Sequence, residues 1–172
     1  MEKVIDDRAI IQKVLEGDRE AYAELVRRHS CRVIALCSAL LSDPVQAEDA
    51  AQEVFLKAYR SLKSYRGGSA FSTWLYRLTF NYCTDLLRRR GRQRMEPMEM
   101  EIVPDPRPNP QKEWEADDTV RRLLDSLPEE AKTILILREI QGLNYEEIAE
   151  VLSCSVDAVK ARRAAQEKAR FL

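Results

Sequence analysis

The chain has 172 residues, of which 45% are hydrophobic and 33% are charged, and its formal net charge is −1. This length suits one domain or two small ones, and the composition excludes disordered, collagen-like and low-complexity proteins. The near-neutral balance excludes a uniformly basic nucleic-acid-binding surface but allows a local basic face. Because no apolar run is long enough to span a membrane and the N-terminus lacks a signal-peptide stretch, we expect a cytoplasmic protein.

Helical spacing of apolar residues predicts an all-α fold with two small helical domains. Residues 8–15 predict a short amphipathic helix, and Asp18 is placed to cap a long helix that ends near Leu41. A further helix is expected over about 70–90. It ends in three arginines, which suit the negative end of a helix dipole.

A third helix of the first domain is expected to begin at Asp43-Pro44. Asp43 is a typical N-cap residue, Pro44 suits the first helical position, and Gln46 would complete a capping box. In this helix, apolar residues recur every three or four positions from Ala47 to Leu62. They predict one continuous buried face.

A change of composition separates the two halves of the chain. Residues 91–118 carry 4 Lys and Arg against 8 Asp and Glu, and they contain five of the seven prolines. Prolines block helix continuation, so we predict an acidic, proline-rich linker over 91–116 between domains 1–90 and 117–172. One domain with a long surface loop is the alternative, but such loops are uncommon within compact folds.

The second domain is expected to contain a helix-turn-helix. After a helix near 117–125 and a second, apolar helix, Asn144 begins a capping-box pattern and Ser155 can cap the last helix after a short turn. An ordinary helical hairpin fits the same geometry. However, the last helix is the more basic of the two, as expected of a helix that enters the major groove of DNA.

Long motifs in both halves resemble one family, the extracytoplasmic-function (ECF) group of bacterial RNA polymerase sigma factors. These are GDREAYAELVRRH, DPVQAEDAAQEVFLKAY and FSTWLYRLTFNYCTDLLRRR in the first half, and LPEEAKTILILREIQGLNYEEIAEVLSCSVDAVKAR in the second. The resemblance covers nearly the whole chain. It implies a stress-response transcription factor, not an enzyme, that binds core RNA polymerase, directs it to promoters and helps to melt the DNA.

The resemblance also implies roles for individual residues. The polymerase is expected to bind the polar face of the helix that begins at Pro44, and Phe55 also falls on that helix's apolar stripe. The matching residues are Asp49, Gln52, Glu53 and Phe55.

The loop and helix over 64–90 interleave aromatic rings with cations, a combination that suits exposed bases and phosphates. In the family this region binds the melted minus-ten element. The candidate residues are Tyr65, Arg66, Phe71, Trp74, Arg77, Asn81, Asp85 and Arg88. The alternative is that the apolar members of this helix are simply core residues, namely Phe71, Trp74, Leu78 and Tyr82. For Trp74 and Leu78, burial in the core is at least as good an interpretation as contact with DNA.

The last helix is the candidate reader of the minus-thirty-five element. Its candidate residues are Ser155, Asp157, Ala158, Lys160, Ala161, Arg162 and Arg163. Arg163 departs from the family, which usually has an apolar residue there, and it interrupts a buried stripe begun by Val156 and Val159. We therefore expect loosely packed last turns and a phosphate contact for Arg163.

Two other functions fit parts of the sequence. A stand-alone DNA-binding regulator would use only the helix-turn-helix, but the near-neutral charge disfavours it because autonomous binding depends on phosphate neutralisation. A polymerase-binding protein that never reads DNA is disfavoured by the aromatic and basic segment 64–90. The expected partners are core RNA polymerase, promoter DNA and an anti-sigma factor.

No cofactor or metal is expected. His29, Cys31 and Cys37 lack a typical ligand spacing, and the four cysteines, which show no CxxC pattern, are expected to be free thiols.

Overall fold

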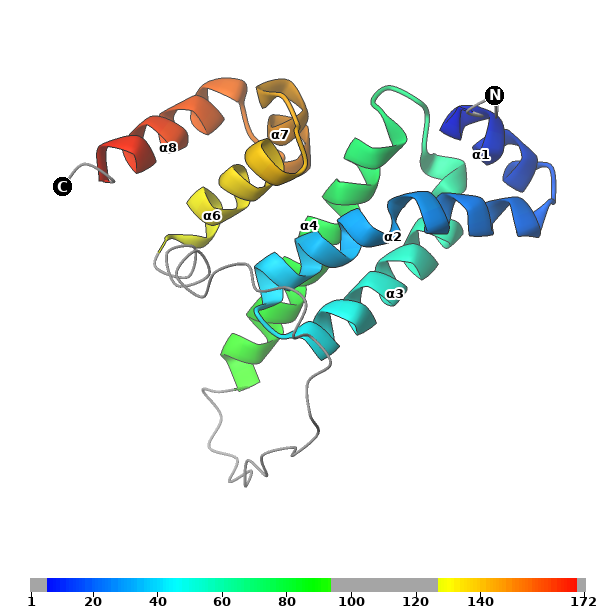
Figure 1. Ribbon diagram of the computed structural model, residues 1–172, viewed down its shortest axis with the longest axis horizontal. Helices are drawn as coiled ribbons and strands as arrows, with labels where there is room; N and C mark the ends of the chain where they lie inside the picture. The colour runs from blue at the N-terminus through cyan, green and yellow to red at the C-terminus, as the bar shows by residue number, and fades with distance from the viewer. Residues whose placement is uncertain (1–5, 94–126, 170–172) are drawn as a thin grey trace.

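The computed structural model describes residues 6–93 and 127–169, and all regular structure in these two ranges is helical (Figure 1). The predicted all-α fold is therefore confirmed. The predicted helix near 117–125 and residues 94–116 of the predicted linker lie outside the described residues. The helices of the first range are α1 (Asp7–Leu15), α2 (Arg19–Leu41), α3 (Pro44–Ser61), η1 (Leu62–Ser64) and α4 (Phe71–Gln93); those of the second are α6 (Glu129–Leu135), the π-helical η2 (Ile136–Ile140), α7 (Tyr145–Leu152) and α8 (Val156–Ala169).

Aspartates cap the first three helices. Asp18 accepts a hydrogen bond from the backbone nitrogen of Ala21 at 3.1 Å, and Asp43 accepts from the backbone nitrogens of the two residues after Pro44. These caps satisfy backbone donors that a helix leaves unpaired at its start. The predicted capping box is wrong in one respect, because the side-chain oxygen of Gln46 is buried without a hydrogen-bond partner.

A first core fills the space between α1, α2, α3 and α4. Side chains such as Leu25, Val54 and Leu75 are fully buried there. Cys37 of α2 and Cys83 of α4 meet inside this core with their Sγ atoms 3.8 Å apart, and all four cysteines of the chain are free, as predicted. The hydrogen bond with Cys83 and burial both raise the pKa of Cys37, which keeps this thiol protonated and inert.

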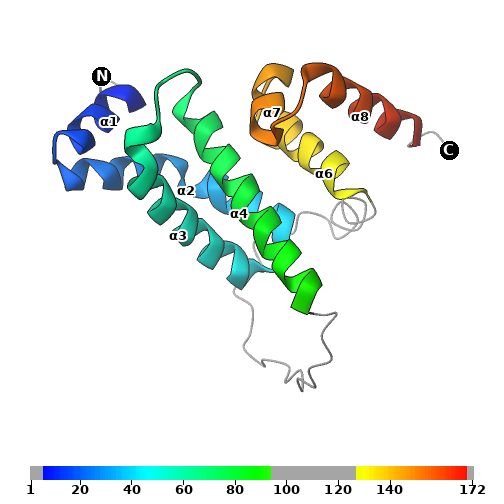
Figure 2. The same cartoon turned by 180° about the vertical axis from the view of Figure 1, so that it is seen from behind.

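A second core joins the two halves of the molecule. Leu36 of α2 and Tyr76 of α4 are fully buried in the same cluster as residues of α6, η2 and α7, and Phe80 of α4 packs against it. The side-chain amide of Gln141 donates a hydrogen bond to the backbone oxygen of Arg32 at 3.2 Å. Both views show α6 and α7 beside α2 and α4, on the side away from α1 and α3, with α8 on the outer side of α6 and α7 (Figures 1 and 2). Sequence reasoning did not predict this contact.

The second half contains the predicted helix-turn-helix. Asn144 and Glu147 form a complete capping box at the start of α7, with two hydrogen bonds of 2.8 Å. The helix ends at Ser153, whose φ of 53° is left-handed, and the Oγ of Ser155 accepts a hydrogen bond from Ala158 at the start of α8. Helix α8 continues to Ala169, so its helical backbone persists well beyond the departure from the family pattern.

Candidate functional site

Three of the four candidate polymerase-binding residues form an exposed face of α3. Asp49, Gln52 and Glu53 are exposed, while the alanines at 47, 50, 51 and 58 on the same helix are buried in the first core. Phe55 is only 8% exposed and belongs to that core. Its side chain is therefore mainly structural, and the polar face consists of the other three residues.

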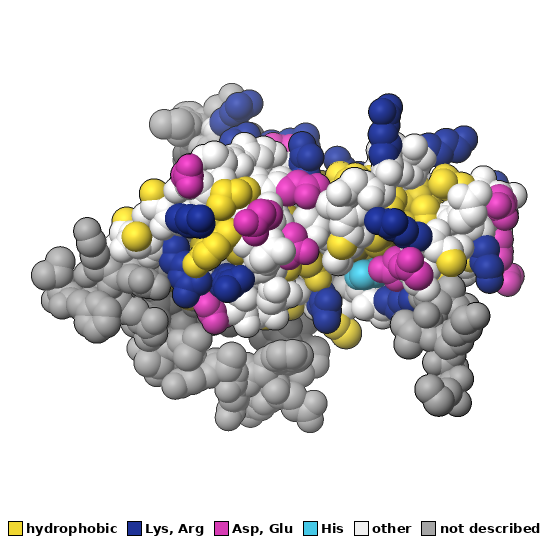
Figure 3. Space-filling model, turned by 90° about the horizontal axis from the view of Figure 1, so that it is seen from above, with side chains coloured by type: hydrophobic (Ala, Val, Ile, Leu, Met, Phe, Trp, Pro, Cys, Tyr) yellow, Lys and Arg dark blue, Asp and Glu magenta, His cyan; other side chains and the backbone are white. Residues whose placement is uncertain are grey.

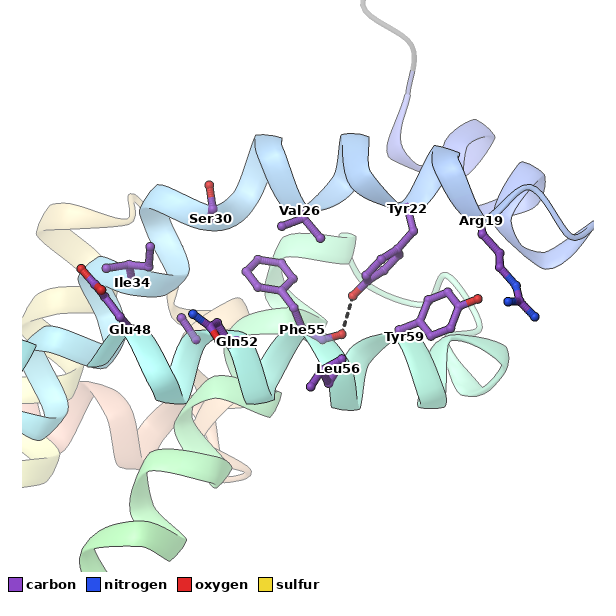
Figure 4. Close-up of a pocket in the computed structure, with 11 residues that line it drawn as sticks. Arg19, Tyr22, Val26, Ser30, Ile34, Glu48, Gln52, Phe55, Leu56 and Tyr59 are labelled. Atoms are coloured by element: carbon purple, nitrogen blue, oxygen red, sulfur yellow. Dashed lines mark hydrogen bonds between the residues drawn. The ribbon is translucent and has the colours of Figure 1, made fainter. Parts of the chain in front are cut away.

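A groove of about 750 Å³ lies beside this face, between α2 and α3 (Figure 4). Leu56 and Tyr59 of α3 are 48% and 39% exposed, and Ile34 of α2 is 36% exposed. The hydroxyl of Tyr22 crosses the groove and donates a hydrogen bond to the backbone oxygen of Phe55 at 2.6 Å. The groove thus offers an apolar surface with a polar rim.

Sequence reasoning missed Leu56 as a candidate surface residue. The available signal was an apolar side chain among the polar positions of α3, beside Gln52 and Glu53. Ile34 could not be found in this way, because its place in the groove depends on how α2 packs against α3.

The loop before α4 is held by an aromatic cluster. The rings of Tyr65, Phe71 and Trp74 lie with their centroids 5.4–5.6 Å apart, and the hydroxyl of Tyr65 donates to the backbone oxygen of Ser69 at 2.7 Å. Phe71 is buried, whereas Tyr65 and Trp74 are half-buried and Arg66 is exposed. Phe71 is therefore best interpreted as a core residue, whereas Tyr65, Arg66 and Trp74 keep surface that a nucleic acid can contact.

The remaining candidates of this segment share one exposed face of α4. Arg77, Asn81, Asp85 and Arg88 follow one another at helical spacing, and all four are exposed. A guanidinium nitrogen of Arg88 lies 3.8 Å from a carboxylate oxygen of Asp85. The other sides of α4 build the two cores, so the fold fixes the direction in which this face points.

The candidates on α8 fall into two groups. Ser155, Asp157, Lys160 and Ala161 are exposed, while Ala158, Arg162 and Arg163 are half-buried. The Nε of Arg162 lies 3.1 Å from a carboxylate oxygen of Glu130 on α6, and a guanidinium nitrogen of Arg163 lies 3.6 Å from a carboxylate oxygen of Glu139. The side chains of Arg162 and Glu130 keep 37% and 63% of their surface exposed, so this ion pair contributes little stability and Arg162 can exchange Glu130 for another anion at low cost.

Charges of both signs are mixed over the surface. Figure 3 shows one face on which acidic and basic side chains alternate with apolar surface, in keeping with the net charge of −1. Among the described residues, no group of three or more His, Cys, Asp and Glu is arranged to hold a metal ion, and no helix is long and apolar enough to cross a membrane.

Two family matches cover the parts of the chain in which these faces lie. Sigma-70 region 2 matches residues 25–93, and Sigma-70, region 4 matches residues 117–165. The RNA polymerase sigma-H factor of Pseudomonas aeruginosa is 35% identical, over 91% of this chain and 87% of the relative. The ECF RNA polymerase sigma-E factor of Haemophilus influenzae is 36% identical, over 94% and 92%.

Solved structures show the same fold. CnrH, solved in complex with the cytosolic domain of CnrY, matches 94% of this chain and 92% of its own with a TM-score of 0.70 and 23% identity. An engineered region 2 of sigmaE, solved in complex with GTAAAA, is 36% identical over 54% of this chain and 97% of its own, with a TM-score of 0.50. The sequence identities over nearly the full length are decisive: the chain belongs to the ECF group of RNA polymerase sigma factors, which direct RNA polymerase to specific promoters for transcription initiation.

Proposed function

We propose that three separate surfaces of this sigma factor each bind a different partner during transcription initiation. The exposed face of α3, with the groove beside it, binds core RNA polymerase. The loop before α4 and the exposed face of α4 bind the melted minus-ten element, and α8 binds the duplex minus-thirty-five element. In this proposal the domain over 1–90 carries the first two surfaces and the domain over 117–172 carries the third.

The observation that carries the proposal is the exposed row of side chains along α4. Arg77 and Arg88 supply cations for phosphates, while Asn81 and Asp85 supply hydrogen-bonding groups for base edges. The half-buried ring of Trp74 lies at the start of the same helix, where a base released from the duplex can stack. The engineered sigmaE region 2 bound to GTAAAA supports a nucleic-acid role for this part of the fold.

The protein is proposed to act without chemistry of its own, as a specificity subunit of the polymerase in the cytoplasm. An anti-sigma factor is proposed as a further partner, on the strength of the family resemblance. The exposed apolar side chains of the groove, Leu56 and Tyr59, suit either protein partner because contact would remove them from water.

Permanganate footprinting of polymerase–promoter complexes tests the assignment of the two DNA-binding surfaces. Asn81→Ala and Asp85→Ala should reduce melting and change base preference at the minus-ten element, with the minus-thirty-five preference unchanged. Arg162→Ala should weaken binding through the minus-thirty-five element; loss of a bidentate base contact would cost about 1–3 kcal/mol at one base position. If the α4 variants left melting and minus-ten preference intact, the assignment would be wrong.

A further inference from the structure

Arg163 is seated against α7. Its guanidinium donates a hydrogen bond to the hydroxyl of Tyr145 at 3.0 Å and lies 5.9 Å from the centroid of the Tyr145 ring. The guanidinium of Arg138 lies 5.0 Å from the same centroid and donates to the backbone oxygen of Leu143 at 2.9 Å. Residues of η2, α7 and α8 therefore meet around one tyrosine ring.

The register of α8 explains why Arg163 is there. Val159 is completely buried between α8 and its neighbours, and position 163 lies one helical turn further along the same face. The side chain of Arg163 is only 29% exposed, whereas Lys160 and Ala161 are exposed on another side of the helix. An arginine can occupy such an edge position because its stem packs on apolar surface while its head reaches polar partners.

We propose that Arg163 is a positioning residue that sets how α8 lies against α7, and that it does not contact DNA phosphates. From the third turn of α8, its planar guanidinium contacts Tyr145, the first residue of α7. An apolar side chain at position 163 would instead extend the buried stripe that Val159 belongs to. This fixes the direction of the exposed face that carries Asp157, Lys160 and Ala161. The inference rests on the proposed function of α8 as reader of the minus-thirty-five element.

Two substitutions separate positioning from phosphate binding. Arg163→Met keeps a long unbranched side chain that packs on an aromatic ring but removes the charge. Arg163→Lys keeps the charge but loses the planar group that both stacks on Tyr145 and donates to its hydroxyl. Positioning predicts that both variants weaken recognition of the minus-thirty-five element, because Met cannot donate to the Tyr145 hydroxyl and Lys cannot stack a planar group on the ring. Phosphate binding predicts that Lys is tolerated and that Met loses one phosphate contact.

The experiment measures promoter binding of core polymerase loaded with each full-length variant, over a range of salt concentrations. The readout is the ratio of affinities for promoters with an intact and a scrambled minus-thirty-five element. Arg163→Met, Arg163→Lys and Arg163→Ala should each lower this ratio by roughly fivefold to tenfold, and Arg163→Met should leave the salt dependence unchanged. The control Lys160→Met, which removes an exposed charge from the same helix, should reduce the salt slope by about 0.9.

The result expected for a phosphate contact would overturn the inference. A salt slope reduced by about 0.9 in Arg163→Met, with normal binding by Arg163→Lys, would identify a phosphate contact. Unchanged ratios in all three Arg163 variants would equally exclude a positioning role. If the wild type itself showed no preference for the intact element, the proposed function of α8 would fail, and that result does not depend on position 163.

Discussion

The contact between α4 and α7 predicts a large movement when the protein engages a promoter. Helix α7 contacts both α4 and α8, so the two helices proposed to read DNA lie about 20–25 Å apart, or roughly two helix diameters. Elements centred near positions −10 and −35 are about 25 base pairs apart, which is about 85 Å along B-form DNA. The two halves must therefore separate by roughly 60 Å before both elements can be bound at once.

Fluorescence energy transfer can measure this separation. A donor on the exposed Cys31 of α2 and an acceptor on Glu146→Cys of α7, in a Cys154→Ser background, report the distance between the halves. Cys37 and Cys83 are buried and should resist labelling. Transfer should be high in the free protein and should fall to near zero in the polymerase–promoter complex.

A second label pair within the first half supplies the control. Transfer between Cys31 and Lys13→Cys should stay constant, because α1 and α2 belong to one core. Phe80→Ala, which removes a ring that packs against the second core, should lower transfer between the halves in the free protein. High transfer between the halves in a complex that is melted at the minus-ten element and protected at the minus-thirty-five element would refute the reasoning.

Three further predictions concern binding and stability. Reversing Asp49 and Glu53 to Lys should weaken polymerase binding at least tenfold in a titration. The unfolding temperature should be nearly unchanged, because both side chains are exposed. Normal affinity in the folded double variant would show that this face of α3 does not bind the polymerase. Burial raises the pKa of the Tyr22 phenol, so above about pH 10 the unfolded state releases a proton that the folded state keeps, and stability measured by urea unfolding should fall as the pH rises further. Tyr22→Phe should show a smaller alkaline loss, whereas an equal loss would show that other groups cause it. Asn144→Ala should lower stability by about 1 kcal/mol through loss of the α7 cap, and a change as small as that of the exposed control Glu146→Ala would contradict this.

Local signals in the sequence predicted the helices well. An aspartate or asparagine followed by apolar residues at helical spacing predicted where these helices begin, and the expected caps at Asp18, Asp43 and Asn144 are present. Each of these interactions spans three residues or fewer, so the sequence contains all the information needed. The capping-box hydrogen bond predicted for the side chain of Gln46 is absent. Sequence patterns could not show this, because burial of that side chain depends on packing between helices.

The contact between the two halves lies beyond such reasoning. Leu36, Tyr76 and Phe80 belong to apolar stripes that sequence patterns identify as buried, but a stripe does not indicate which helix covers it. Their partners on η2 and α7 are more than 50 residues away, across the predicted linker. For the same reason, the groove between α2 and α3 could be recognised only once both helices were placed.

The charges on α8 lead us to expect weak binding of duplex DNA by this protein in the absence of the polymerase. Two of the cations that sequence reasoning assigned to DNA already have acidic neighbours, since Arg162 lies beside Glu130 and Arg163 beside Glu139. Of the three candidate cations on this helix, Lys160 is exposed, whereas Arg162 and Arg163 are half-buried. Affinity for duplex DNA rises with the number of phosphates that a protein neutralises. Because two of the three candidate cations lie beside carboxylates, we expect this surface to discriminate between sequences while contributing little affinity, provided that the polymerase holds the DNA against it.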